Sequence, residues 1–230
     1  MAIESLDLSL PPFQPEMVKV LDETNTESAS VPLYTMVPNI SMSRLEEIAE
    51  IPQEEWETIY MENKVVRVAK PTPDFSGQSL TELITTHIAM DKDIKPTDGG
   101  ASLIGWMPDY FIVVTNEDIE DHGLLLVYAD PGFKDEENAE DNEDPKMGKF
   151  FFRSKDMFNI ISGRIFSGTD WDDLEESYGM DSEKKDADDE GSEDDEDDED
   201  DEDDEDDEDD EDEEDNAEEE DKDKNDDDWV

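Results

Sequence analysis

A long run of acidic residues limits what this chain can fold into more than any other feature of the sequence. Residues 186–228 are mostly Asp and Glu, and residues 193–214 are acidic without exception, with Asp-Asp-Glu repeated at a period of three. Such a run has no apolar side chains to bury, and its like charges repel one another. Burial therefore cannot offset the conformational entropy lost on folding. We predict that residues 180–230 form a long, disordered, low-complexity acidic tail.

The negative charge extends beyond this tail. The sequence has 74 acidic and 17 basic residues, a net charge of −57, and 37 of the acidic and 4 of the basic residues lie in residues 181–230. Residues 1–180 therefore carry a net charge of −24. Nucleic acids and anionic membranes would be repelled, whereas basic proteins would be attracted over a long range. We expect basic partners such as histones, ribosomal proteins or nucleic-acid-binding proteins, and neither direct nucleic-acid nor membrane binding.

The absence of cysteine restricts the chemistry further. With no cysteine in the sequence, a disulfide framework, a thiolate metal site and a cysteine nucleophile are excluded. The first residues lack the basic segment and apolar run of a signal peptide, and nowhere do about 18 apolar residues follow one another, as a membrane span requires. We expect a soluble intracellular protein and leave nucleus and cytoplasm open.

Two further segments precede the tail. Residues 1–40 contain five of the twelve prolines, with short apolar stretches between polar ones, and this predicts a Pro-rich, partly extended N-terminal arm. Residues 41–179 have the hydrophobic periodicities of a folded body. Their length is typical of a single domain.

Two capping boxes of the form Ser-x-x-Glu predict where helices begin in this body. They start at Ser43 and Ser79, and apolar residues recur at helical spacing after each. Further helices are predicted after Pro52, after Ser154 and after Asp170. Trp56, Trp106, Trp171 and the Phe-Phe-Phe run at 150–152 are expected to be core residues of the body.

The most strand-like segments follow the second capping box. Residues 110–115 and 124–129 are nearly continuous apolar runs, which predict the central strands of an antiparallel pair. Shorter strands are predicted at 64–69, 101–106 and 149–153. Because the helices are grouped before and after the strands, we predict an α+β fold with a small, mainly antiparallel sheet.

The two histidines are the first candidates for catalysis or metal binding. His87 lies on the apolar stripe of a predicted helix, so we expect a buried core histidine with hydrogen-bond partners. His122 stands near Asp118, Glu120 and Asp121, which could raise its pKa or bind a divalent cation with it. Acidic neighbours are expected by chance in this sequence, however, and the common hydrolase, nucleotide and zinc-peptidase motifs are missing. We predict no catalytic, cofactor-binding or metal-binding residues and no enzyme, with the His122 loop as the weaker enzymatic hypothesis.

The tail is the predicted partner-binding element. It would attract Lys- and Arg-rich segments and compete with nucleic acid for them. The final apolar dipeptide, with its free carboxylate, suits a groove that captures chain ends. The predicted partner-binding residues are Glu193, Asp194, Asp195, Glu196, Asp200, Glu202, Asp210, Glu214, Trp229 and Val230.

An ordered body that ends in a long Asp/Glu tail is similar in outline to acidic histone chaperones and other escorts of basic proteins. The resemblance is one of architecture and composition; residues 41–179 match no family motif, so it implies no residue roles. Our hypothesis is a non-enzymatic acidic binding protein that neutralises the charge of a basic protein partner, as a histone chaperone or an assembly factor does. The alternative is a structural or assembly protein, for example a viral one, that self-associates through residues 110–129 and uses the tail for solubility.

Overall fold

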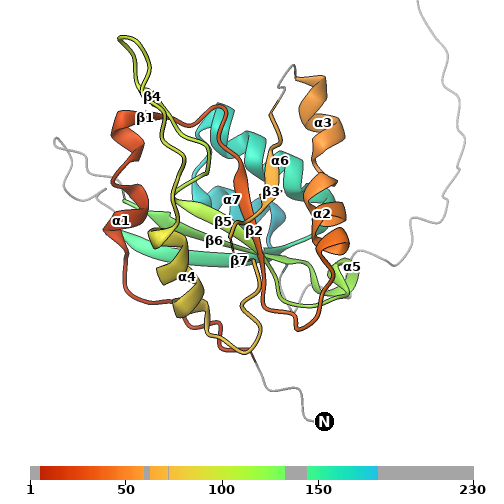
Figure 1. The fold of residues 1–230 in the computed structure, drawn as a ribbon. Coiled ribbons are helices and arrows are strands. Elements are labelled where there is room, and N and C mark those ends of the chain that lie inside the picture. The colour runs from red at the N-terminus through yellow and green to blue at the C-terminus, as the bar shows by residue number, and fades with distance from the viewer. Residues whose placement is uncertain (1–5, 60–62, 72, 133–143, 181–230) are drawn as a thin grey trace, which may run out of the picture. The chain divides into compact units, whose positions relative to one another are not determined.

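A mixed five-stranded sheet lies between two layers of helices (Figure 1). The computed structural model describes residues 6–59, 63–71, 73–132 and 144–180. All predicted partner-binding residues, in 193–230, lie outside these ranges. The strands of the sheet, in spatial order, are β3 (Val66–Val68), β2 (Val31–Thr35), β5 (Tyr110–Val114), β6 (Leu124–Asp130) and β7 (Lys146–Phe152).

The strand directions confirm part of the prediction and correct part of it. The expected antiparallel pair is present, with Tyr110 of β5 opposite Tyr128 of β6, and β7 extends it. The α+β class is also correct, but the sheet is not mainly antiparallel, because β3, β2 and β5 run parallel to one another. The sequence pattern of β2 marks an apolar strand without indicating its neighbours or its direction. β2 comes from the segment predicted as an N-terminal arm and is an interior strand of the sheet, between β3 and β5.

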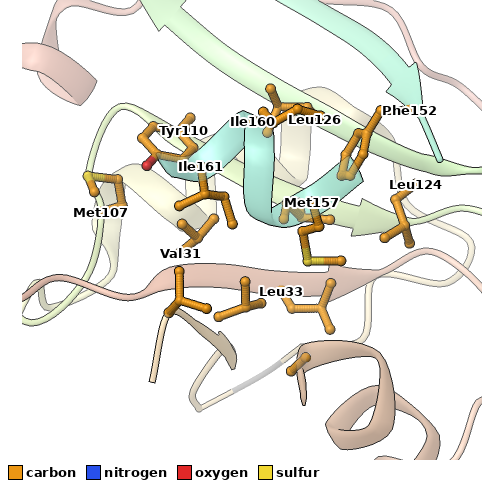
Figure 2. Close-up of a cluster of buried hydrophobic side chains, with 14 of the residues drawn as sticks. Val31, Leu33, Met107, Tyr110, Leu124, Leu126, Phe152, Met157, Ile160 and Ile161 are labelled. Carbon is orange, nitrogen blue, oxygen red and sulfur yellow. The ribbon is translucent and has the colours of Figure 1, made fainter. Parts of the chain in front are cut away.

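Of the described helices, four contribute most of the cover on one face of the sheet. These are α2 (Met42–Glu50), α3 (Gln53–Thr58), α6 (Met157–Ser162) and α7 (Trp171–Tyr178). Figure 2 shows Met157 and Ile161 of α6 directed toward Val31 and Leu33 of β2. Residues at alternate positions of each strand point to this face, so β2 contributes its odd-numbered residues to this core. The buried tryptophans of α3 and α7 belong to the same cluster, as expected.

The opposite face has a second apolar core. The intervening strand residues, including Tyr34, Phe111 and Val127, pack against α4 (Leu80–Ala89) and α1 (Pro15–Val18). Partly buried side chains from the first described residues, among them Leu8 and Phe13, lie against this cluster. Because both faces of β5 and β6 are covered, their residues are buried almost without exception. This explains the continuous apolar runs in their sequences.

The helix starts test the two capping boxes separately. At Ser79 both halves are present: its Oγ accepts from the backbone N–H of Glu82 at 3.3 Å, and the Glu82 carboxylate accepts from the backbone N–H of Ser79 at 2.8 Å. The prediction for Ser43 was wrong. Helix α2 begins at Met42, and its cap is Ser41, whose Oγ accepts from the backbone N–H of Arg44 at 3.1 Å. Ser41 rather than Ser43 caps the helix because the backbone of Ser41 is extended, as the N-cap position requires.

The remaining elements are short. β1 (Thr24–Asn25) and β4 (Ser102–Leu103) form a separate parallel pair, so the strand predicted at 101–106 is limited to two residues. α5 (Ile119–His122) is a single turn between β5 and β6. Within the described part of the chain, no helix has the length and hydropathy to span a membrane.

Candidate functional site

His87 is a core residue whose ring nitrogens both have partners. Nε2 lies 2.9 Å from the carbonyl oxygen of Pro108, which can only accept, so Nε2 carries the proton and donates it. Nδ1 then accepts from the Tyr34 hydroxyl at 3.1 Å. Burial, together with the nearby Lys92 charge, lowers the pKa of His87 to about 3 and keeps the ring neutral. The prediction of a buried, hydrogen-bonded histidine is confirmed.

The acidic residues around His122 have structural roles. The Asp118 carboxylate caps α5 by accepting from the backbone N–H of Asp121 at 3.2 Å. Glu120 accepts from the Ser154 hydroxyl, also at 3.2 Å. Among the residues that the structure describes, no three His, Asp or Glu side chains come together as a metal site would require. Residues 118–122 are close along the chain, but their acidic and histidine side chains do not form such a group.

The connections between the parallel strands create a second candidate site. After β2 the chain forms α2 and α3 on one face of the sheet, and after β3 it forms α4 on the other face. The chain therefore leaves the carboxyl ends of two neighbouring parallel strands in opposite directions. In sheets with parallel strands, such a switch point opens a crevice in which ligands commonly bind.

A cleft of about 1000 Å³ lies at this edge of the sheet, and we call it the carboxyl-edge cleft. It is formed where β2 and β5 end, together with the segment that leads into α4 and the first described residues. Its apolar and polar groups are mixed, as in a binding site that orients its ligand. The cleft is lined by Leu6, Asp7, Met36, Val37, Pro38, Ser76, Gly77, Gln78, Ser79, Thr115, Asn116 and Glu117.

The charged groups of the carboxyl-edge cleft are all acidic. Asp7 and Glu117 are its charged lining residues, and no Lys or Arg is among the described residues that line it. Hydrogen bonds from Ser9, one of them from its backbone N–H at 3.1 Å, lower the pKa of Asp7. Glu82 of α4 and Lys149 of β7 both lie near enough to Asp7 for their charges to interact. The lining residues themselves carry only negative charge and suit a cation.

Sequence reasoning did not find this cleft. Its lining comes from four separate segments of the chain, and only the strand order brings them together. One signal was present: Thr115, Asn116 and Glu117 are polar residues directly after a buried strand, at a position that often carries function.

The fold and the cleft together define an α+β protein with a mixed sheet and an acidic site at the carboxyl edge of its parallel strands. Comparison with known proteins finds no family model, no curated protein and no solved structure that matches this chain.

Proposed function

We propose that this chain is a non-enzymatic binding protein that engages a basic protein partner. Its folded body contributes specificity through the carboxyl-edge cleft, and the acidic residues 181–230 contribute long-range attraction. The observation that carries the proposal is the pairing of a large, partly apolar cleft with exclusively acidic charged lining residues, Asp7 and Glu117. A ligand that complements both features has an aliphatic stem and a positive end. Lysine and arginine side chains have that form.

The mechanism would be charge neutralisation. The Asp/Glu side chains of the tail would replace nucleic-acid phosphates around the Lys and Arg side chains of the partner, so that the partner stays soluble until it is handed over. A period-three acidic repeat offers every basic segment much the same surface. Selection among basic partners would therefore depend on the cleft, and also on Trp229 and Val230 if a groove captures the chain end.

We further propose an intracellular location and partners of the histone, ribosomal or nucleic-acid-binding kind. These proteins carry the clustered positive charge that would draw them to a chain with a net charge of −57.

Peptide binding at several salt concentrations tests the proposal. Several Lys/Arg-rich peptides of equal charge and different sequence are titrated into the full chain, into a chain that ends at residue 180, and into the full chain carrying D7N and E117Q. We expect affinity to fall steeply with salt for the full chain, less steeply without the tail, and discrimination between peptide sequences to weaken in the cleft variant. Equal binding by the full and the shortened chain at low salt would refute the role of the tail. Unchanged sequence discrimination in the cleft variant would refute the role of the cleft.

Self-association through residues 110–129 stays the alternative proposal. The strands in this segment, β5 and β6, are covered on both faces, so a second copy has no access to their side chains. The edge strands of the sheet are β3 and β7, and self-association would have to use one of these edges. Mass measurement at low and high concentration, with and without residues 181–230, distinguishes the two proposals: a stable oligomer that survives removal of the tail would favour assembly.

A further inference from the structure

A pocket of opposite charge lies at the other edge of the parallel strands. It has a volume of about 340 Å³, within the range of small-ligand sites, and we call it the amino-edge pocket because Ser30 directly precedes β2 and Lys64 lies just before β3. Three of its lining residues are cations, Lys64, Arg67 and Lys95, against one carboxylate, Asp93. These three cations come from two distant parts of the chain. Because basic residues are scarce in this body, three of them in one pocket indicate that the pocket suits an anion.

Arg67 is the fixed cation of this pocket. Its guanidinium carbon lies 3.9 Å from the centre of the Trp106 ring, and its Nη2 donates to the carbonyl oxygen of Gly105. These two contacts hold the guanidinium plane in one orientation. Its Nε is buried without a hydrogen-bond partner. The guanidinium has five N–H donors in all, so donors remain for an acceptor oxygen in the pocket.

Lys64 and Lys95 are adaptable cations at the rim. Their side chains are 57 % and 67 % exposed, and each forms one ion pair, Lys64 with Glu50 and Lys95 with Asp93, the latter at 3.0 Å. Exposed ion pairs of this kind contribute little to stability, so either ammonium can turn toward a ligand at small cost. The pocket thus combines one preorganised guanidinium with two mobile ammonium groups.

Neutral polar groups complete the pocket. Ser28, Ser30 and Asn63 also line it, and the local structure holds two of them in place. The Ser30 hydroxyl donates to the carbonyl oxygen of Lys64, and the Asn63 side-chain amide donates to the carbonyl oxygen of Ser28 at 3.2 Å. Hydroxyl and amide groups beside a guanidinium and two lysines are the usual surroundings of a multiply charged oxyanion.

We propose that the amino-edge pocket binds a phosphate group, supplied either as inorganic phosphate or as a phosphorylated side chain of a partner. The phosphate oxygens accept from the remaining N–H groups of the Arg67 guanidinium and from the two lysines. The large negative charge of the chain does not prevent this, since fields are screened beyond about 8 Å at physiological salt and the pocket residues act at contact distance. The inference does not depend on the proposed function.

Inorganic phosphate is the first probe. Thermal unfolding of the full chain is followed at pH 7.5 with increasing phosphate, while NaCl keeps the ionic strength constant at about 0.15 M. We expect a saturable rise in Tm, since a ligand that binds the folded state stabilises it. In the K64Q/K95Q variant the apparent Kd should rise about tenfold or more, because two charge-assisted hydrogen bonds are lost.

The variants are chosen so that folding and binding can be separated. Lys64 and Lys95 are exposed, so K64Q/K95Q leaves the core intact, whereas R67Q also removes packing on Trp106 and serves as a second variant only. K155Q removes a positive charge from an exposed residue outside the pocket and should bind phosphate as the native chain does. The inference is refuted if phosphate stabilises no more than chloride at equal ionic strength, or if K64Q/K95Q binds as well as K155Q.

A peptide distinguishes the two sources of the phosphate. A short phosphoserine peptide and its unphosphorylated form are titrated into the full chain and into K64Q/K95Q. Tighter binding of the phosphopeptide than of inorganic phosphate, lost in K64Q/K95Q, assigns the pocket to a phosphorylated side chain. Equal affinities assign it to the free anion. Equal binding of the phosphorylated and unphosphorylated peptides refutes the phosphopeptide source.

Discussion

Replacing Asp109 by Asn should stabilise the protein at neutral pH. Asp109 is only 3 % exposed, and its Oδ1 has no hydrogen-bond partner. Burial raises the pKa of Asp109 to about 6, and the charge of Arg164 offsets this only in part. An unfolded aspartate has a pKa near 3.9. The folded state thus keeps a proton that the unfolded state has lost, and the free energy of unfolding falls as the pH rises from about 4 to about 6.

The size of the effect follows from the difference between the two pKa values. A difference of about two units corresponds to about 3 kcal/mol, and this whole penalty is present above pH 6. Asparagine has nearly the same shape and no charge, so Asp109→Asn removes the penalty. The new amide loses the attraction to Arg164 and brings donors of its own, so we expect a net gain of about 1–3 kcal/mol at pH 7.5. Near pH 4 the native and variant chains should be about equally stable.

Urea unfolding followed by tryptophan fluorescence measures this difference. Many carboxylates titrate in the same range, so the quantity to compare is the difference between variant and native chain at pH 7.5 and at pH 4.5. The matched control is Asp98→Asn, the same substitution at an exposed position, for which we expect no pH-dependent difference. The reasoning is refuted if Asp109→Asn destabilises the protein at pH 7.5, or if its effect is the same at both pH values.

Three further outcomes can be checked by simple measurements. Ser79→Ala removes the capping box of α4 and should lower the free energy of unfolding by about 1 kcal/mol in chemical denaturation, whereas Ser43→Ala, which removes no cap, should have little effect. Gly148→Ala would place a methyl group 2.1 Å from the buried Tyr128 ring, which is stacked on Trp171, and should lower Tm markedly, at a cost of about 1–3 kcal/mol or more. Glu117→Gln should weaken binding of a Lys/Arg peptide about two- to fivefold at low salt, measured by titration, with the difference fading at high salt.

Local sequence patterns predicted local structure well. The Ser79 capping box, the core position of His87 and the antiparallel pair of β5 and β6 each depend on residues that are near in sequence or on the burial of continuous apolar runs. The failure at Ser43 has the same origin. Two serines two residues apart both resemble caps, and the backbone conformation at Ser41 decides between them.

Long-range pairing was beyond the reach of these patterns. An apolar strand such as β2 fits equally well beside several neighbours, and its place between β3 and β5 depends on how the crossovers pack on the two faces. The carboxyl-edge cleft and the amino-edge pocket could not be predicted for the same reason. Each is lined by segments that are distant in sequence and are brought together only by this strand order. Asp7 and Glu117 line one cleft, but no sequence pattern indicates that they lie near each other.

The interior position of β2, between β3 and β5, also governs how the chain can reach its folded state. The turn between β5 and β6 closes a short loop, but Thr35 of β2 meets Val114 of β5 across 79 residues of sequence. Until that long loop closes, the edges of β2 and β5 that pair with each other stay unpaired. Sheets built from such distant pairings fold more slowly than folds made of local contacts. The nascent or refolding chain therefore passes through a period in which its most apolar strands are accessible to other molecules.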